Sequence, residues 1–213
     1  MNRNNLVEEQ DKKGFYVWID PAHFLARYHI TTLGLFSSQE SKSDNLMFVP
    51  NSDFNQFISP FQYNLLNNYL AEYNLELARR SYFSQYPSRL DAIFLFETKE
   101  EAINYGRKHR EHVFSRILKK VVSDGLYKFS KHDLSWIDFL NLGLSNDSDT
   151  LDNVSRSYWS GERVCDCKLL ARGVSWTQKP ILEILYIGTI KFENRNLDKH
   201  DVEVDIFKNN SEL

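Results

Sequence analysis

Glycine is scarce and widely spaced in this chain of 213 residues. The eight glycines lie at positions 14, 34, 106, 125, 143, 161, 173 and 188, and no two of them are closer than twelve residues. Walker A loops, Rossmann GxGxxG turns and GxSxG elbows each need at least two glycines within about six residues. The spacing therefore excludes all three motifs. It predicts that any bound nucleotide is held by side chains.

The composition favours one folded domain without a membrane span. Hydrophobic residues make up 42% of the chain, and 26 Lys and Arg against 29 Asp and Glu give a net charge of −3. A chain of this size can bury a core of its own. The stretch from Met1 to Lys13 is polar and lacks the apolar segment of a signal peptide. No apolar run approaches the roughly 18 residues that cross a bilayer. We expect a soluble, cytoplasmic protein with no membrane partner.

Metal-ligating residue types occur in two short patterns, and both are weak signals. Cys165 and Cys167 form a CxC pair with no second pair, whereas zinc usually has four nitrogen or sulfur ligands. We expect two strand residues on one face instead. Two cysteines are also too few for a disulfide framework and fit a reducing compartment. His109 and His112 form an HxxH pattern without a third ligand, so the sequence assigns no metal site.

The domain boundaries follow from polarity. Residues 1–13 are charged and amide-rich, so we expect a disordered N-terminus. Residues 196–213 form a polar C-terminal tail that contains one short alternating run at 202–207. Between them we find no repeat and no linker. A single domain over residues 14–195 is the simplest organisation.

The order of the predicted elements favours an α+β domain. Apolar, β-branched and aromatic runs predict strands at 15–19, 27–32, 91–96, 113–122 and 181–192. Helical spacing and capping residues predict helices from Pro60 to before Pro87, from Thr98, from Asp133 or Ser135 through Leu140, and over 155–160. We expect a turn at Asp124-Gly125 and a loop at 141–153. Strands outnumber helices and do not alternate with them regularly, which argues against a doubly wound sheet.

His29, in the predicted strand at 27–32, is the first candidate binding residue. A single His in a strand is more often a hydrogen-bonded core residue than a catalyst. Its two ring nitrogens also suit it to hold ribose hydroxyls at a strand end. Thr31, two residues later, would face the same side of a strand. The residues alone leave both interpretations open.

The segment Tyr86-Pro-Ser-Arg89 precedes a predicted buried strand. Ser88 adds a hydroxyl, and Arg89 brings a planar cation that can bind a phosphate through two hydrogen bonds. Arg79 lies three residues after Glu76 on the predicted long helix, where a surface ion pair is the simpler interpretation. Because it lies at the mouth of a buried strand, Arg89 is the stronger candidate for contact with a ligand.

Glu183 interrupts the apolar strand predicted at 181–192. Burial of an ionised carboxylate without partners is costly, so such a residue lies on a solvated face or at a functional cleft. Alternation places Glu183 on the same face as Ile181 and Leu185. This position favours a functional role.

A basic stretch follows the helix predicted from Thr98. Its candidate phosphate-contacting residues are Arg107, Lys108, Arg110, Arg116, Lys119 and Lys120. A solvated face is the simpler explanation, but in a protein of net negative charge the stretch also suits a nucleic-acid backbone.

Four motifs carry a resemblance over about residues 27 to 192. They are Glu76-Leu-Ala-Arg79, Tyr86-Pro-Ser-Arg89, Tyr158-Trp-Ser-Gly161 and Glu183-Ile-Leu185. In this order they resemble an uncharacterised bacterial family with E-x-x-R, Y-P-S-R, Y-W-x-G and E-L-L motifs. That family implies a common fold and no established activity.

A second resemblance concerns Tyr28-His-Ile-Thr31 and the late strand that opens with Glu183. These segments resemble ADP-ribosyltransferases of the His-Tyr-Glu type, above all the DarT-like toxins that modify nucleic acid. The resemblance implies a split, strongly curved β-sheet with NAD between its halves. It implies that His29 holds an NAD ribose with Thr31 beside it, that Tyr28 also belongs to the cofactor site, and that Glu183 is the catalytic glutamate.

The middle motif of those enzymes, a Tyr or Ser-Thr-Ser, has no clear counterpart here, and Ser88-Arg89 is the candidate for its place. Arg89 and Arg79 would then balance the pyrophosphate. Tyr86, Phe94 and Trp159 are the candidates for stacking on nicotinamide. The catalytic set implied by the resemblance is thus Glu183, His29 and Arg89.

The resemblance implies an NAD-dependent ADP-ribosyltransferase that modifies a macromolecule, with nucleic acid favoured over protein as acceptor. A bacterial toxin or phage-defence effector, with an antitoxin as a possible partner, would have this activity. A catalytically silent nucleotide- or partner-binding module on the same fold is an alternative. An NAD glycohydrolase or an RNA 2′-phosphate remover is a third.

Overall fold

The computed structural model describes residues 5–38, 40, 69–141, 147–168, 170–171 and 174–206. Several expectations lie outside these residues. They concern residues 60–68 of the predicted long helix, 142–146 of the predicted loop, and the extreme ends of the chain.

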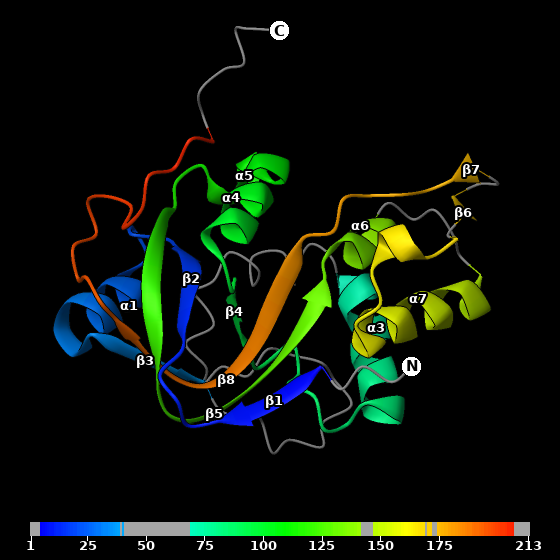
Figure 1. Ribbon diagram of the computed structural model, residues 1–213, viewed down its shortest axis with the longest axis horizontal. Helices are drawn as coiled ribbons and strands as arrows, with labels where there is room; N and C mark the ends of the chain where they lie inside the picture. Colours follow the sequence, from blue (N-terminus) through cyan, green and yellow to red (C-terminus); the bar gives the residue numbers. More distant parts are fainter. Residues whose placement is uncertain are drawn as a thin grey trace, which may run out of the picture.

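Two long antiparallel strands, β5 (Ile117–Asp133) and β8 (Leu182–Phe192), form the centre of the main sheet. Among the described residues this sheet has six strands in the order β1-β5-β8-β3, with β2 added on β5 and β4 on β8. The α+β class expected from the sequence is confirmed. Figure 1 shows that β5 and β8 bend together across the molecule.

Each long strand has a different partner on each side of the bend. The first part of β5 pairs with β2 (Gly14–Ile19), and its later part pairs with β1 (Leu6–Glu9). On β8, residues 184–186 pair with β4 (Ile93–Leu95), and residues 188–191 pair with β3 (Leu35–Ser38). The sheet therefore consists of two halves that share β5 and β8. A bridge between Tyr16 and Phe96 also joins β2 to the end of β4.

The bend coincides with a break in the ladder between Asp124 and Lys128 of β5. Gly125 has a φ of 76° there, and Gly188 of β8 has a φ of 138°. A Cβ on Gly188 would lie 2.8 Å from the Cβ of Tyr127. The turn expected at Asp124-Gly125 is therefore wrong in kind, because the register of the ladder shifts there and the chain continues as the same strand.

Both faces of the sheet are buried, which explains the continuous apolar runs in its strands. Val17 and Ile93 belong to one hydrophobic cluster, while Trp18 and Phe94 belong to another on the opposite face. Helices α1 (Phe24–Arg27) and η1, a π-helix (Tyr28–Leu33), contribute to the first cluster. The second cluster packs against α3, α4, α6 and α7.

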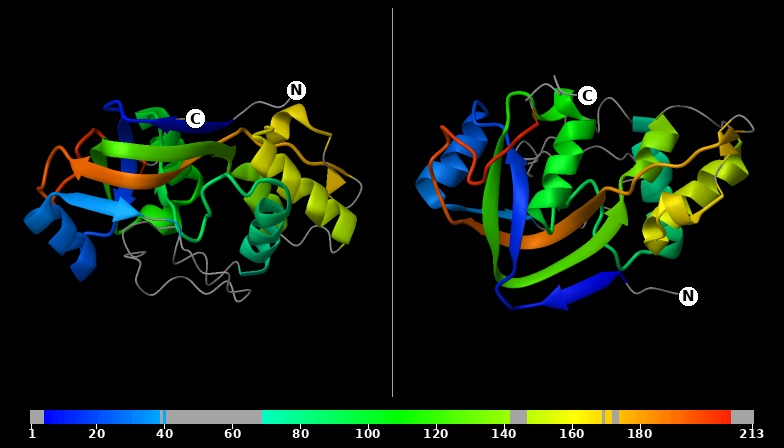
Figure 2. Two further views of the ribbon diagram at one scale, coloured as in Figure 1. Left: turned by 90° about the horizontal axis from the view of Figure 1, so that it is seen from below. Right: turned by 45° about the horizontal axis from the view of Figure 1, so that its top comes forward.

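These four helices have the bounds α3 Tyr69–Tyr82, α4 Lys99–Lys108, α6 Ser135–Asn141 and α7 Ser148–Ser160. Helices α3, α6 and α7 gather beyond one end of the sheet, and α1 lies at the opposite end (Figures 1 and 2). Three short elements complete the described fold: α5 Arg110–Val113, the 3₁₀ turn η3 Val164–Asp166, and a ribbon of β6 Leu170–Ala171 and β7 Val174–Ser175. No helix among the described residues is both long and apolar enough to span a membrane.

Local capping determines several of these boundaries. The capping box predicted at Thr98 is confirmed, because Thr98 and Glu101 exchange hydrogen bonds of 3.2 Å at the start of α4. The loop expected at 141–153 is wrong over its second half. There Asp147 caps α7 by accepting a hydrogen bond of 2.9 Å from the Thr150 amide.

The strand expected at 27–32 is also wrong, since this segment is helical. Ala26 and Ile30 are both buried, and their spacing of four residues matches one face of a helix. The hydroxyl of Thr31 donates a 2.7 Å hydrogen bond to the Arg27 carbonyl, and Gly34 ends the helix with a φ of 72°. The β-branched residues that suggested a strand are therefore held in η1.

Both polar ends of the chain contribute to the fold, in contrast to the disorder and free tail expected. Residues 6–9 form β1, which pairs with β5. Leu197 and Ile206 are buried, and Asp201 forms an ion pair with the buried Lys119. The alternating run near Val202 packs on the core without a strand ladder. Cys165 and Cys167 are free thiols in and just after η3, where strand positions were expected.

Candidate functional site

Helix α3 presents two carboxylates, Glu72 and Glu76, to the interior. They lie one helical turn apart, so both occupy one face of α3, a helix that packs mainly against α7. Each is almost fully buried, which requires a cationic or hydrogen-bonding partner. The chain that follows α3 supplies one for each.

Arg89 is the partner of Glu72. Its Nε and Nη2 donate hydrogen bonds of 2.8 and 3.0 Å to the two carboxylate oxygens, which is the bidentate geometry of a strong ion pair. Its Nη1 donates to the hydroxyl of Tyr158 at 2.7 Å and to Oε1 of Glu183. The guanidinium also lies 4.8 Å from the ring centroid of Phe94. We call Glu72, Arg89, Tyr158 and Glu183 the Arg89 network.

Glu183 completes the network from the start of β8. The Tyr158 hydroxyl donates a 2.6 Å hydrogen bond to its Oε1, which thus accepts from both Tyr158 and Arg89. Its Oε2 is buried and has no hydrogen-bond partner among the described residues. The prediction that Glu183 shares a face with Ile181 and Leu185 is confirmed, because both belong to the cluster on that side of the sheet.

Glu76 forms a second cluster beside the first. Arg79 binds it through two hydrogen bonds of 2.9 and 2.8 Å, Arg80 through one of 2.9 Å, and the Ser88 hydroxyl through one of 2.9 Å. Burial alone would raise the pKa of Glu76, but these donors and the charge of Arg79 lower it below its ordinary value. Arg79 also donates to the Tyr86 carbonyl at 3.0 Å, so this cluster holds the Tyr86–Arg89 segment against α3.

His132 lies opposite Glu183 in the ladder between β5 and β8. Its ring stacks on Tyr158 with centroids 4.5 Å apart, and its Nδ1 donates a 2.9 Å hydrogen bond to the Tyr158 carbonyl. Burial lowers the pKa of His132 to about 3, so the ring is neutral at physiological pH. With Nδ1 carrying the proton, Nε2 accepts from the Ser130 hydroxyl at 2.7 Å.

The environment of Glu183 gives it an unusual acidity. Burial raises the pKa of Glu183 to about 7, although Arg89 and the Tyr158 hydroxyl act in the opposite direction. Burial alone would lower the pKa of Arg89, but the carboxylates of Glu183 and Glu72 raise it well above its ordinary value, so Arg89 stays charged. Since Oε1 already accepts two hydrogen bonds, a proton on Glu183 resides on Oε2. Glu183 can thus release or accept a proton near neutral pH.

Most of the predicted cofactor-binding residues lie around this network. Tyr86 and Trp159 stack with centroids 6.2 Å apart, and Trp159 donates a 2.7 Å hydrogen bond to the Leu75 carbonyl of α3. Both aromatic residues are buried, as is Phe94 beneath Arg89. The residues that the structure brings together are Arg79, Tyr86, Ser88, Arg89, Phe94, Trp159 and Glu183.

The N-terminal candidates lie elsewhere. His29 is in η1, where its Nδ1 is 3.3 Å from the Leu35 carbonyl and its ring meets Phe36 edge-on at 5.2 Å. Leu35 pairs with Lys191, eight residues after Glu183 on β8, or roughly 26 Å of strand length. Tyr28 is 51% exposed on η1. Because residues two apart on a helix point in different directions, Thr31 does not share the side of His29.

The basic stretch divides among α4, α5, β5 and the residues between α5 and β5. Arg107, Lys108 and Arg110 are exposed on α4 and α5, with Lys108 paired to Asp138. Arg116 donates a 2.8 Å hydrogen bond to the His112 carbonyl, and Lys120 is paired with Glu193. Lys119 is the correction in this set, because its side chain is fully buried against Asp201 and the Asn196 carbonyl and cannot reach a nucleic-acid backbone.

Three residues of the site were not among the predicted site residues. Tyr158 had a usable signal, since it opens the Tyr158-Trp-Ser-Gly161 motif beside the residue chosen as a stacking candidate. Glu72 lies four residues before Glu76, which places both on one helix face. His132 alternates with Ser130 in a strand, a pattern that gives no indication of chemistry without its neighbours.

Comparison with known proteins adds a family and no activity. The family model described as "Protein of unknown function (DUF2441)" matches residues 22–174, and the chain belongs to this family. No curated protein matches the chain. The matched region contains Glu72, Arg89 and Tyr158 and ends before β8, so the strand that carries Glu183 lies outside it.

Proposed function

We propose that this member of the DUF2441 family is an NAD-dependent ADP-ribosyltransferase that modifies a macromolecule in the cytoplasm. The observation that carries the proposal is Glu183, a buried carboxyl at the start of a late strand with one oxygen, Oε2, that no described residue engages. Its pKa of about 7 is typical of a group that works in a reaction. Two half-sheets that share two bent strands also agree with the split, curved sheet that the sequence resemblance implies.

The chemistry assigns Glu183 one task. In this reaction the bond between nicotinamide and ribose breaks, nicotinamide leaves, and an acceptor nucleophile forms the new bond to the same ribose carbon. Positive charge develops on the ribose, and a fixed carboxylate that accepts a hydrogen bond from a ribose hydroxyl stabilises it. The ionised Oε2 has the right chemistry for this role. Arg89 and Tyr158 hold the opposite oxygen, Oε1, and so fix the orientation of the carboxylate.

The two arginines fit the pyrophosphate role less well than the sequence suggested. Arg89 uses Nε, Nη1 and Nη2 on Glu72, Tyr158 and Glu183, and Arg79 uses the same three atoms on Glu76 and on backbone carbonyls. We therefore assign them to positioning, of Glu183 by Arg89 and of the Tyr86–Arg89 segment by Arg79. His29 lies in η1, and we keep it as a candidate contact with NAD outside the Arg89 network.

The direct test is incubation of the purified chain with NAD, with nicotinamide release and labelling of RNA, DNA and protein as separate readouts. We expect Glu183→Gln, which keeps the size of the side chain, to lower nicotinamide release about 100-fold to 1,000-fold, the range for loss of one fixed electrostatic group. Glu193→Gln removes an exposed carboxylate just after β8 and serves as the matched control. Full activity of a folded Glu183→Gln variant would refute the assignment.

The acceptor is proposed to be nucleic acid, and the exposed cations of α4 and α5 support this choice. Arg107 and Arg110 both lie on the surface. Replacement of both by Gln should weaken labelling of nucleic acid, with a shallower salt dependence, while nicotinamide release into water stays unchanged. Equal loss of both readouts would argue for a structural effect, and labelling confined to protein would contradict nucleic acid as acceptor.

A toxin or defence role with an antitoxin partner also predicts that cells without an antidote tolerate Glu183→Gln better than the wild type.

A catalytically silent binding module on the same fold is the second candidate. The observation in its favour is burial, since Arg89, Tyr158 and Glu183 are nearly or fully inaccessible and engage one another. Such a network has the features of a structural core. A thermal shift with NAD but no nicotinamide release, unchanged in Glu183→Gln, would favour the module. Release without any labelled acceptor would instead indicate an NAD glycohydrolase.

A further inference from the structure

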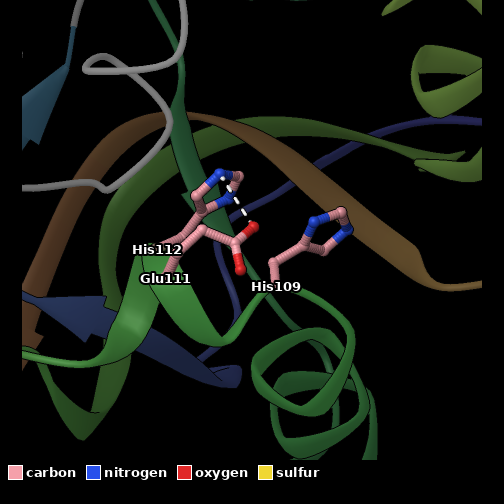
Figure 3. A group of neighbouring side chains, drawn as sticks. All are labelled: His109, Glu111 and His112. Atoms are coloured by element: carbon pink, nitrogen blue, oxygen red, sulfur yellow. Dashed lines mark ion pairs between the residues drawn. The ribbon is translucent and has the colours of Figure 1, made fainter. Parts of the chain in front are cut away.

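The corner between α4 and α5 brings two imidazoles and a carboxylate together. His109 ends α4, and Glu111 and His112 lie in the short helix α5. One potential ligand atom from each of the three side chains lies within 4.8 Å of the other two. Figure 3 shows the carboxylate of Glu111 between the two rings in this view. We call His109, Glu111 and His112 the His–Glu corner.

The ligand chemistry of the His–Glu corner is that of a transition-metal site. Imidazole nitrogens bind Zn²⁺ and its neighbours at about 2.0–2.1 Å, and a carboxylate oxygen binds at about 2.0–2.2 Å. Nε2 of His112 is already 3.5 Å from Oε1 of Glu111, close to the separation of two ligands on one ion.

A second layer of residues orients the corner. The Tyr105 hydroxyl and Nδ1 of His112 share a hydrogen bond of 2.8 Å, which directs the other ring nitrogen of His112 toward Glu111. Nε2 of His109 lies 3.8 Å from Oδ1 of Asp138 on α6. Imidazoles that bind metals usually have such a partner, because it sets the tautomer and the direction of the ring.

We propose that His109, Glu111 and His112 bind a divalent transition-metal ion of the Zn²⁺ class, with water in the remaining position. The two rings are now parallel, with an interplanar angle of 6° and centroids 5.1 Å apart. An ion lies in the plane of each imidazole that binds it, so at least one ring turns when the site closes. Because His109 also faces Asp138, a residue of α6 lies in the second layer around the bound ion.

The charges that face the corner set the strength of binding. Glu111 and Asp138 attract a cation, whereas Lys108, which pairs with Asp138, and Arg116, which binds the His112 carbonyl, oppose it. Two formal negative charges thus face two positive ones. We infer a site of moderate affinity that gains most of its binding energy from the imidazoles.

The test uses the full chain without a histidine tag, stripped of metal with a chelator. Titration with Zn²⁺ by calorimetry, and with Co²⁺ by visible absorption, should show one equivalent bound, with nitrogen and oxygen ligands to Co²⁺. His109→Ala and His112→Ala should each weaken Zn²⁺ binding at least tenfold. His23→Ala, at the start of α1, is the control and should bind like the wild type. Binding should also weaken at acidic pH, because protons compete with the metal ion for the imidazoles.

Glu111→Gln keeps the test decisive if a His variant does not fold, because the Glu111 side chain is 69% exposed and its amide can be accommodated. It too should weaken binding at least tenfold. Absence of saturable Zn²⁺ binding to the wild type would overturn the proposal. So would wild-type affinity in Glu111→Gln and in a folded His variant. These outcomes are independent of NAD chemistry, since none of the readouts is an activity.

Discussion

Carboxylates meet cationic or imidazole side chains in two regions of this molecule, the Arg89 network and the His–Glu corner. In the network the side chains are buried and joined by hydrogen bonds of normal or short length. In the corner they are half-exposed and 3.5 Å or more apart, apart from the hydrogen bond between His112 and Tyr105. The carboxylates that are buried together with their partners thus form a tightly hydrogen-bonded network. At the surface, where the three side chains of the corner are farther apart, their arrangement suits the proposed binding of a metal ion.

Removal of the central cation should have the largest effect and would test whether the network is closed. Arg89→Ala leaves Glu72 and Glu183 buried without their cationic partner, so we expect a loss of about 3–5 kcal/mol in the free energy of unfolding. Urea denaturation measures this loss. Arg89→Lys keeps the charge without the planar fork and should recover only part of it. Arg156→Ala, an exposed residue of α7, is the control.

The second largest effect should be a pH dependence of stability that comes from Glu183 in the Arg89 network. Because the pKa of Glu183 is raised from 4.5 to about 7 in the folded chain, the folded state binds this proton more tightly than the unfolded state. The contribution of Glu183 is fully present below about pH 4.5 and is lost as the pH rises to 7, by on the order of 3 kcal/mol. The difference between wild type and Glu183→Gln across this range isolates it. A flat difference would show that Glu183 titrates normally.

Loss of the Tyr158 hydroxyl should lower the free energy of unfolding by less than loss of the Arg89 cation. Tyr158→Phe keeps the ring that stacks on His132 but removes the acceptor for Arg89 and the donor to Glu183. We expect a loss of about 1–3 kcal/mol. The Tyr158 hydroxyl lowers the pKa of Glu183, so the midpoint of the pH profile should also move upward. An unchanged midpoint would mean that the hydroxyl does not act on Glu183.

The smallest effect is expected in the corner. Without metal, Glu111→Gln should change the free energy of unfolding by no more than about 0.5 kcal/mol, because the side chain is exposed. With saturating Zn²⁺ the wild type should melt at a higher temperature and the variant should not follow it. A large loss of unfolding free energy without metal would show that Glu111 has a structural role, like the buried carboxylates of the Arg89 network.

The sequence predicted Arg89 and Glu183 better than the N-terminal candidate His29. Arg89 and Glu183 could be identified because a charged residue in or beside an apolar strand needs a partner, and the two residues form an ion pair with each other. His29 could not be assessed in this way. Its neighbours are β-branched, and only the burial of Ala26 and Ile30 by the sheet shows that the segment is helical.

The remaining differences have the same physical origin. Lys119 counts as one of six basic residues in the sequence, but only the pairing of the C-terminal segment with β5 reveals that Asp201 buries it. The sequence of residues 6–9 is typical of a disordered end, but in the structure these residues pair with the edge of β5 as strand β1. In each case a partner more than 80 residues away determines the outcome, and local patterns carry no information about that partner.

The position of β8 has a consequence for synthesis of the chain. It is the last strand of the described sheet along the sequence, yet it lies between β5 and β3 and also holds β4. Until it leaves the ribosome, β3 and β4 have no ladder partner in this sheet, and β5 exposes one edge. The sheet therefore closes only after β8 has been synthesised. Glu183, which β8 carries, joins Arg89 in that same step.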